Sequence, residues 1–256
     1  MPLDGRAYVS IAELVIYLPL TLAAVSVCKR HGFERSSGWI YIIMLGIIRV
    51  IGAVCNLVTY SSPSVGLYTA VFTLDSIGIS PMLFATLGLI SRLFRWTQAL
   101  SNTRARSKQF RLAQLVFTAG FILSIVGGVT TQNTTDPSTI SRVAILLYLL
   151  GFIVCAGFEA TAWTNLSHHQ SIPAAERNIV FIVAAALPLI LIRIIFSLLV
   201  VFVHDSTFSI VRGPTGVYVG MAVVEEVLVM VMYTIAGWRV GPLDEAMSTT
   251  ALLVQH

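Results

Sequence analysis

Residues 178–203 read NIVFIVAAALPLILIRIIFSLLVVFV, an apolar run of 26 residues interrupted by one charge, Arg193. An α-helix needs about 20 predominantly apolar residues to cross the hydrocarbon core of a bilayer. The run is therefore long enough to span a membrane. An arginine near the middle of such a span is costly to bury, so its presence needs an explanation.

Six further runs of this kind lie along the chain. Of its 256 residues, 56% are hydrophobic and only 11% are charged, whereas soluble domains carry charge on about a quarter of their residues. Seven spans and their short connections use up the whole length, so we predict an all-α bundle of seven transmembrane helices that forms one domain over 1–256. We find no internal repeat of the kind that transporters built from duplicated halves contain. The predicted spans are 7–27, 39–59, 66–89, 112–131, 143–166, 178–203 and 215–238.

Lysine and arginine are distributed unevenly between alternate connections. One side holds eleven of them, including six from Arg92 to Arg111, and the other side holds three. Because basic residues near span ends stay in the cytosol, we predict an amino end outside or in the lumen and a carboxyl end in the cytosol. The sequon Asn133-Thr134-Thr135 lies in an outer connection and predicts a glycoprotein. We expect an endomembrane location such as the endoplasmic reticulum, or the plasma membrane for a receptor.

The positions of lysine and histidine exclude several classes of membrane protein. Lys29 and Lys108 both lie in predicted connections, so no lysine can hold retinal in the last span, as microbial-type retinal proteins require. The histidines also fall in connections or the tail: His31, His168, His169, His204 and His256. We therefore predict no metal site, no cofactor and no Ser/His hydrolase. The net charge of +4 suits an anionic leaflet better than a nucleic-acid partner.

Seven ionisable residues lie inside the predicted spans. Each costs roughly 2.5 to 3.5 kcal/mol at the centre of a helix on insertion scales, so such residues normally face the bundle interior or a polar cavity. At 1.5 Å per residue, all but one of them share the predicted outer half of the membrane, and Glu159 lies nearer the cytosolic end. The seven residues are Arg49 and Arg193 with Glu13, Asp75, Glu159, Glu225 and Glu226.

These charges have a structural and a functional interpretation. The two arginines could neutralise two acids in salt bridges that fix the packing, but at least three of the five acids would then lack a cation. An unpaired buried carboxyl stays protonated and can donate a proton. On the functional interpretation the candidate catalytic residues are Asp75, Glu225, Glu226 and Glu13. The candidate substrate-binding residues are Arg49, Asn56, Tyr60, Phe72, Arg193, Phe196 and Tyr218. The ring faces of the aromatic residues among them could stabilise a cation.

Four segments carry a resemblance to known proteins: AELVIYLP (12–19), GLISRLFR (88–95), LPLILIRIIFSLL (187–199) and VVEEVLVMVMYTIAG (223–237). They resemble a large fungal family of seven-span integral membrane proteins, most of them uncharacterised. The chain also looks like the small membrane-bound terpene cyclases of meroterpenoid pathways. That resemblance implies that Asp75, Glu225 or Glu226 acts as an acid on a prenylated substrate. Where the better-known cyclases carry a tryptophan-glutamate landmark, span two of this chain has Arg49 and Asn56.

Two functional hypotheses of different classes follow. The first is a cofactor-free isomerase of the terpene-cyclase type, in which a buried acid starts the cyclisation of a prenylated, hydrophobic molecule inside the membrane. The alternative is a non-enzymatic seven-span receptor or lipid-binding protein whose charges only hold the helices together. A proton-coupled transporter is a third possibility, and the missing repeat counts against it.

Overall fold

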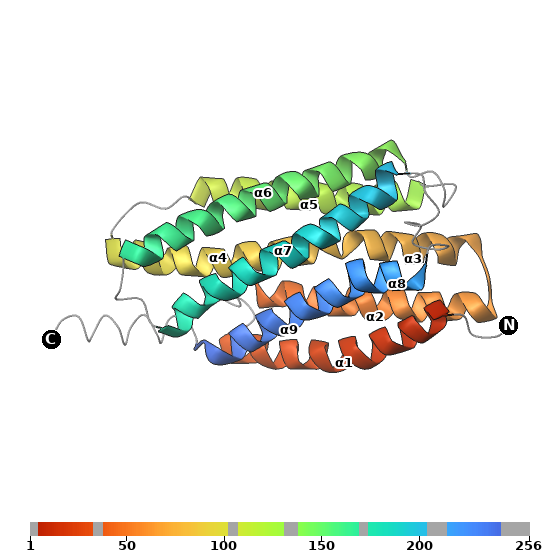
Figure 1. The fold of residues 1–256 in the computed structure, drawn as a ribbon, viewed down its shortest axis with the longest axis horizontal. Coiled ribbons are helices and arrows are strands. Elements are labelled where there is room, and N and C mark those ends of the chain that lie inside the picture. The colour runs from red at the N-terminus through yellow and green to blue at the C-terminus, as the bar shows by residue number, and fades with distance from the viewer. Residues whose placement is uncertain are drawn as a thin grey trace.

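A computed structural model describes residues 5–32, 38–101, 107–130, 138–168, 174–203 and 214–241. In these residues the chain forms helices that run roughly along the long axis of the molecule (Figure 1). Their bounds are α1 Gly5–His31, α2 Trp39–Ser61, α3 Val65–Ile77, α4 Ile79–Ser101, α5 Ser107–Thr130, α6 Thr139–His168, α7 Ala174–Phe202, α8 Thr215–Tyr218, the π-helix η3 Val219–Val223 and α9 Val224–Arg239.

Seven helical segments in the described part of the chain are long and apolar enough to cross a membrane. Helices α3 and α4 together make the third segment, and α8, η3 and α9 make the seventh. The predicted all-α, seven-span membrane fold is therefore confirmed. The predicted spans match these segments to within a few residues, except that helix α4 continues to Ser101, well beyond the predicted end at residue 89.

The third segment lies at the centre of the bundle. Helix α4 contacts α2, α5, α6 and α7, and Figure 1 shows α5 and α6 along one edge and α1 along the other. Side chains on the outer helices point away from the bundle, including Val15, Leu22, Leu112 and Ile153. Such a continuous apolar exterior fits hydrocarbon rather than water.

The third segment breaks at Gly78, between α3 and α4. Three residues later, Pro81 lacks the N–H that would bond to the carbonyl of Ile77, and its ring crowds that carbonyl. A proline at this position is tolerated in the first turn of α4 but would disrupt one continuous helix. The break leaves the Asp75 carbonyl open to side chains from other helices. By contrast, α7 passes through Pro188 without interruption.

Two side chains assigned by the sequence to connections are instead buried on helices. Arg92 of α4 is fully buried, and its Nη2 lies 2.5 Å from Oε1 of Glu176 on α7. His31 ends α1 and stacks on Trp39 with 4.4 Å between ring centroids. The predictions that these residues lie in loops are wrong, because polar residues at a span end can stay helical when another helix satisfies them.

Another histidine, His168, is also predicted to lie in a loop. His168 is the last residue of α6 rather than a loop residue. His169, His204, His256 and the sequon Asn133-Thr134-Thr135 lie outside the described residues.

Candidate functional site

Four charged side chains from four helices meet inside the bundle. They are Arg49 of α2, Asp75 of α3, Arg193 of α7 and Glu226 of α9, and we call them the ion network. Arg49 Nη1 lies 2.7 Å from Asp75 Oδ1, while its Nε and Nη2 donate to the two carboxylate oxygens of Glu226. Arg193 Nε donates to Glu226 Oε1 over 2.7 Å, and its Nη2 lies 3.2 Å from Asp75 Oδ2.

The ion network is buried and electrically balanced. Arg193 and Glu226 are 0% exposed, and Arg49 and Asp75 are also buried. Arg193 donates further hydrogen bonds to the Asp75 carbonyl, at 2.9 Å, and to Ser197 Oγ, at 2.7 Å. Two guanidinium groups and two carboxylates sum to zero charge, and charge-assisted hydrogen bonds of this kind are the strong ones. Removing any one of these four side chains would leave an uncompensated buried charge.

The break at Gly78 makes room for this arrangement. A Cβ atom at Gly78 would lie 2.6 Å from Arg49 Nη2, closer than non-bonded atoms can approach. Glycine therefore lets the guanidinium lie against the backbone of the broken helix. The same break exposes the Asp75 carbonyl to Arg193.

Glu13 of α1 lies beside the ion network without joining it. The Tyr218 hydroxyl lies 3.1 Å from Asp75 Oδ1 and 3.4 Å from Glu13 Oε1, so its single hydrogen serves both acids. Within the described residues, Glu13 has no ion pair, although it is only 6% exposed. Glu13 is thus a buried acid that has a tyrosine partner but no cation partner.

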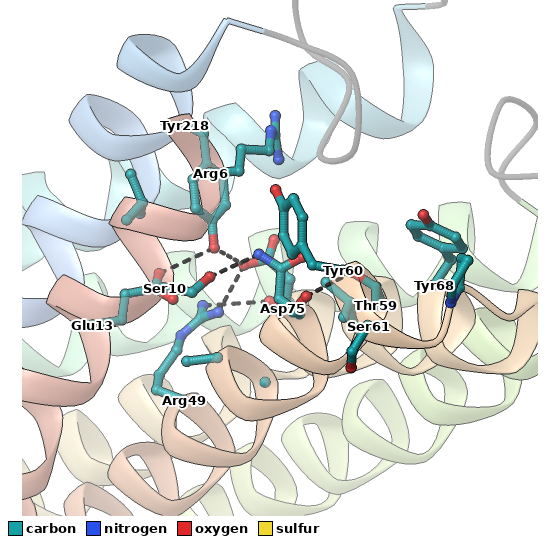
Figure 2. A pocket seen from close by; sticks show the side chains of 16 residues that line it. Arg6, Ser10, Glu13, Arg49, Thr59, Tyr60, Ser61, Tyr68, Asp75 and Tyr218 are labelled. Carbon is teal, nitrogen blue, oxygen red and sulfur yellow. Dashed lines mark hydrogen bonds and ion pairs between the residues drawn. The ribbon is translucent and has the colours of Figure 1, made fainter. Parts of the chain in front are cut away.

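A cavity of about 460 Å³ lies next to these groups, between them and the turn that joins α2 to α3. Its inner wall includes Glu13, Arg49 and Asp75, and its outer rim includes Ser61 and Pro63, which are exposed to solvent. Figure 2 shows the Tyr218 hydroxyl pointing into the space between Glu13 and Asp75. The cavity therefore reaches from the exposed turn between α2 and α3 down to the ion network.

The lining of the cavity is mixed in character. Its polar side chains include Asn56, whose Nδ2 donates to Ser10 Oγ over 2.7 Å. Apolar side chains such as Val9 and Val71 share the wall. A mixture of this kind suits a molecule with both an apolar body and a polar group.

The structure brings together most of the candidate residues that the sequence predicted. Those that line the cavity are Glu13, Arg49, Asn56, Tyr60, Asp75 and Tyr218. Arg193 and Glu226 belong to the ion network below it. Phe72 and Phe196 do not line the cavity and pack with Ala222 in a small apolar cluster, in which the Phe196 ring lies 6.3 Å from that of Tyr218.

Two buried acids lie elsewhere. Glu225 neighbours Glu226 on α9 but lines no part of this cavity. Among the described residues it joins no salt bridge, and its Oε2 has no hydrogen-bond partner. Glu159 of α6 is buried away from the cavity, and its Oε1 also has no partner there. The six outer-half charges predicted to share one depth therefore divide into a network of four, its neighbour Glu13, and the separate Glu225.

Sequence reasoning missed Arg6, Ser10 and Ser197. A usable signal existed for Ser10, because Ser10, Glu13 and Tyr17 recur at helical spacing on α1, and all three are buried. Arg6 lies in the first turn of α1, where a single charge looks like an ordinary solvated end. No group of three or more potential metal ligands occurs among the residues that the structure describes.

Comparison with known proteins gives a family but no activity. The model of a family described as a domain of unknown function (DUF7702) matches residues 3–242, which is nearly the whole chain. No match was found among curated proteins.

Proposed function

Because the chain belongs to the DUF7702 family, for which no function is known, we propose from the geometry of the site that it is a ligand-binding membrane protein. It binds a small amphiphilic molecule in the cavity above the ion network and acts as a receptor or lipid-binding protein. The ion network forms the structural floor of that cavity and takes no part in chemistry.

The observation that carries this proposal is the cavity itself. Its volume of about 460 Å³ lies within the range of roughly 300 to 1,000 Å³ typical of small-molecule sites. It begins at exposed residues of the α2–α3 turn and ends at buried charges. A ligand could therefore enter from that end of the bundle and place its polar group against Asn56, Tyr218 or Glu13.

The hydrogen bonding of the ion network supports a structural role for its acids. Asp75 accepts hydrogen bonds from both arginines, and Glu226 does so as well. A carboxylate held by two guanidinium groups is a poor proton donor, because protonation would break both pairs. This argues for binding rather than for an acid-initiated reaction at Asp75 or Glu226.

Filling the cavity would test the binding proposal. Val71 lines the cavity, so Val71→Trp would occupy part of it, whereas Val58→Trp adds the same bulk on the outer face of α2. We expect mass spectrometry of organic extracts from the purified protein to find a small molecule in the wild type and in Val58→Trp that is lost from Val71→Trp. An identical set of compounds in all three proteins, or none in any, would refute the proposal.

Glu13 supports a second candidate, the terpene-cyclase reaction. Its carboxyl group lines the cavity together with the rings of Tyr60, Tyr68 and Tyr218, whose faces could stabilise a carbocation. In this reaction the Glu13 proton adds to the terminal epoxide oxygen of a prenylated substrate, the C–O bond breaks, and an internal alkene closes the ring. The final carbocation returns a proton to the Glu13 carboxylate, so the product is an isomer of the substrate.

The cyclase candidate has a direct assay. Membranes that contain the protein would be incubated with farnesylated phenols and their epoxides, and products would be analysed by mass spectrometry. The reaction predicts a cyclic isomer that disappears in Glu13→Gln and persists in Glu225→Gln, because Glu225 does not line the cavity. If no isomer forms, or if Glu13→Gln forms as much as the wild type, the reaction is ruled out.

The distribution of lysine and arginine supports a further part of the proposal, the orientation with the amino end outside or in the lumen. The mouth of the cavity then faces the exterior or the lumen. In the plasma membrane this geometry suits a receptor for an external ligand, and in an endomembrane it suits a lipid-binding protein or a cyclase.

A further inference from the structure

We infer that the cavity is selective for organic ammonium ions, so that its ligand is an amine with an apolar body. This inference rests on the proposed binding function and names the chemical class of the ligand. It follows from the balance of charge on the cavity wall and from the aromatic rings that share that wall.

Four charged residues line the cavity: Arg6, Glu13, Arg49 and Asp75. Arg49 is already paired, since its Nε and Nη2 donate to Glu226 and its Nη1 donates to Asp75. Asp75 is neutralised in the same network. These two residues therefore present little net charge to a ligand.

Glu13 is the ionisable group at the inner end that is not neutralised by an ion pair among the described residues. It is buried, with 6% of its surface exposed, and it accepts a hydrogen bond from the Tyr218 hydroxyl. An unpaired buried charge is costly, so a buried carboxyl without a cation favours its neutral form. A bound ammonium group would supply the missing cation and could also donate hydrogen bonds to Glu13.

Arg6 does not fill this role. Its guanidinium carbon lies 5.3 Å from the centroid of the Tyr218 ring, and Figure 2 shows the Arg6 side chain extended away from Glu13. The contact does show that the Tyr218 face accommodates a cation. Tyr60 also lines the cavity, and Tyr68 lines it at the end away from Glu13 (Figure 2). Aromatic rings combined with a carboxylate are a recurrent way to recognise ammonium ligands.

An anionic ligand fits the cavity less well. To reach a cation at the inner end it would have to displace Glu226 or Asp75 from Arg49, where those acids already form close pairs. It would also approach the Glu13 carboxylate. Like charges brought together in a partly buried site repel strongly.

Thiol-reactive reagents of different charge can measure this selectivity before any ligand is known. Asn56→Cys would place a thiol on the cavity wall beside Ser10, which precedes Glu13 by one helical turn on α1. The variant would be made in a Cys55→Ser background, because Cys28 and Cys155 are buried and Cys55 is half-buried. The reagents are the trimethylammonioethyl, hydroxyethyl and sulfonatoethyl methanethiosulfonates.

The readout is the ratio of cationic to anionic labelling rates, divided by the same ratio for Ser62→Cys. Ser62 is exposed and outside the cavity, so it corrects for intrinsic reactivity. We expect a corrected ratio of about ten or more for Asn56→Cys, because Glu13 lines the same partly buried cavity, where charges are poorly screened. Adding Glu13→Gln should bring the ratio close to one, and adding Glu225→Gln should leave it unchanged. Each variant would first be checked for a single monodisperse peak in size exclusion.

The neutral reagent separates the two proposals. If hydroxyethyl labelling of Asn56→Cys proceeds but the corrected ratio is near one or favours the anion, the ammonium inference is wrong and the binding site stands. If the neutral reagent fails to label a monodisperse Asn56→Cys protein, the cavity is closed and both proposals fail.

Protection by matched ligands completes the test. Tryptamine should slow hydroxyethyl labelling of Asn56→Cys at a concentration at least about tenfold lower than tryptophol, its alcohol analogue of equal size. Equal protection by the two compounds, or stronger protection by indole-3-propionate, would overturn the inference.

Discussion

Removing Arg193 should destabilise the bundle more than any other single loss of charge on α7. The substitution Arg193→Met keeps a long unbranched side chain but removes four donor contacts, to Glu226 Oε1, Ser197 Oγ, and both the carbonyl and Oδ2 of Asp75. Two buried carboxylates would then share one guanidinium. The ion network would carry a net charge of −1.

The expected loss is about 3 to 5 kcal/mol, the usual cost of orphaning a buried charge. Native proteins have only about 5 to 15 kcal/mol of stability in total, so this loss is a large fraction. The double variant Arg193→Met with Glu226→Gln removes one charge of each sign and leaves the Arg49–Asp75 pair, whose Nη1–Oδ1 distance is 2.7 Å. It should therefore be more stable than the sum of the single losses predicts, by about 1 to 3 kcal/mol.

Unfolding of the purified protein in mixed micelles of dodecyl maltoside and dodecyl sulfate, followed by tryptophan fluorescence, would measure both quantities. Arg177→Met is the matched control, because Arg177 is an exposed arginine of the same helix and should change stability by less than about 0.5 kcal/mol. A loss below about 1 kcal/mol for Arg193→Met, or strictly additive losses in the double variant, would refute the idea that the ion network supports the fold.

Three further predictions concern other parts of the molecule. Gly78→Ala should cost about 1 to 3 kcal/mol in the same unfolding assay because its Cβ would displace the Arg49 guanidinium, whereas Gly157→Ala, at an exposed position of α6 with open space around it, should be neutral or stabilising. Arg92→Met should cost about 3 kcal/mol or more by leaving a buried carboxylate unpaired, and an unchanged unfolding curve would contradict that. If the protein is in the plasma membrane, a membrane-impermeant maleimide should label Ser62→Cys on intact cells. If it is in an endomembrane, the reagent should label Ser62→Cys only after sealed vesicles are opened; labelling from the cytosolic side alone would reverse the predicted orientation.

Local sequence was enough to locate the helices and the unusual charges. Each span is an apolar run long enough to cross a bilayer, and that property depends on neighbours along the chain alone. Arg92 is a residue whose location local sequence does not reveal. It stands in a mixed stretch that looks like a cytosolic connection, and only a partner on α7, far away in sequence, makes it a buried helical residue.

The sequence by itself therefore determined that this is a seven-span membrane protein and that Arg193 and its companions are misplaced charges. It could not decide which acids the arginines neutralise, because Glu225 and Glu226 are adjacent in sequence but about 100° apart around α9, and only Glu226 faces both arginines. The packing of α1, α2, α3, α7 and α9 made that choice. It also left Glu13 on the cavity wall with no ion pair in the part of the chain that the structure describes, a feature that arises only when distant helices meet.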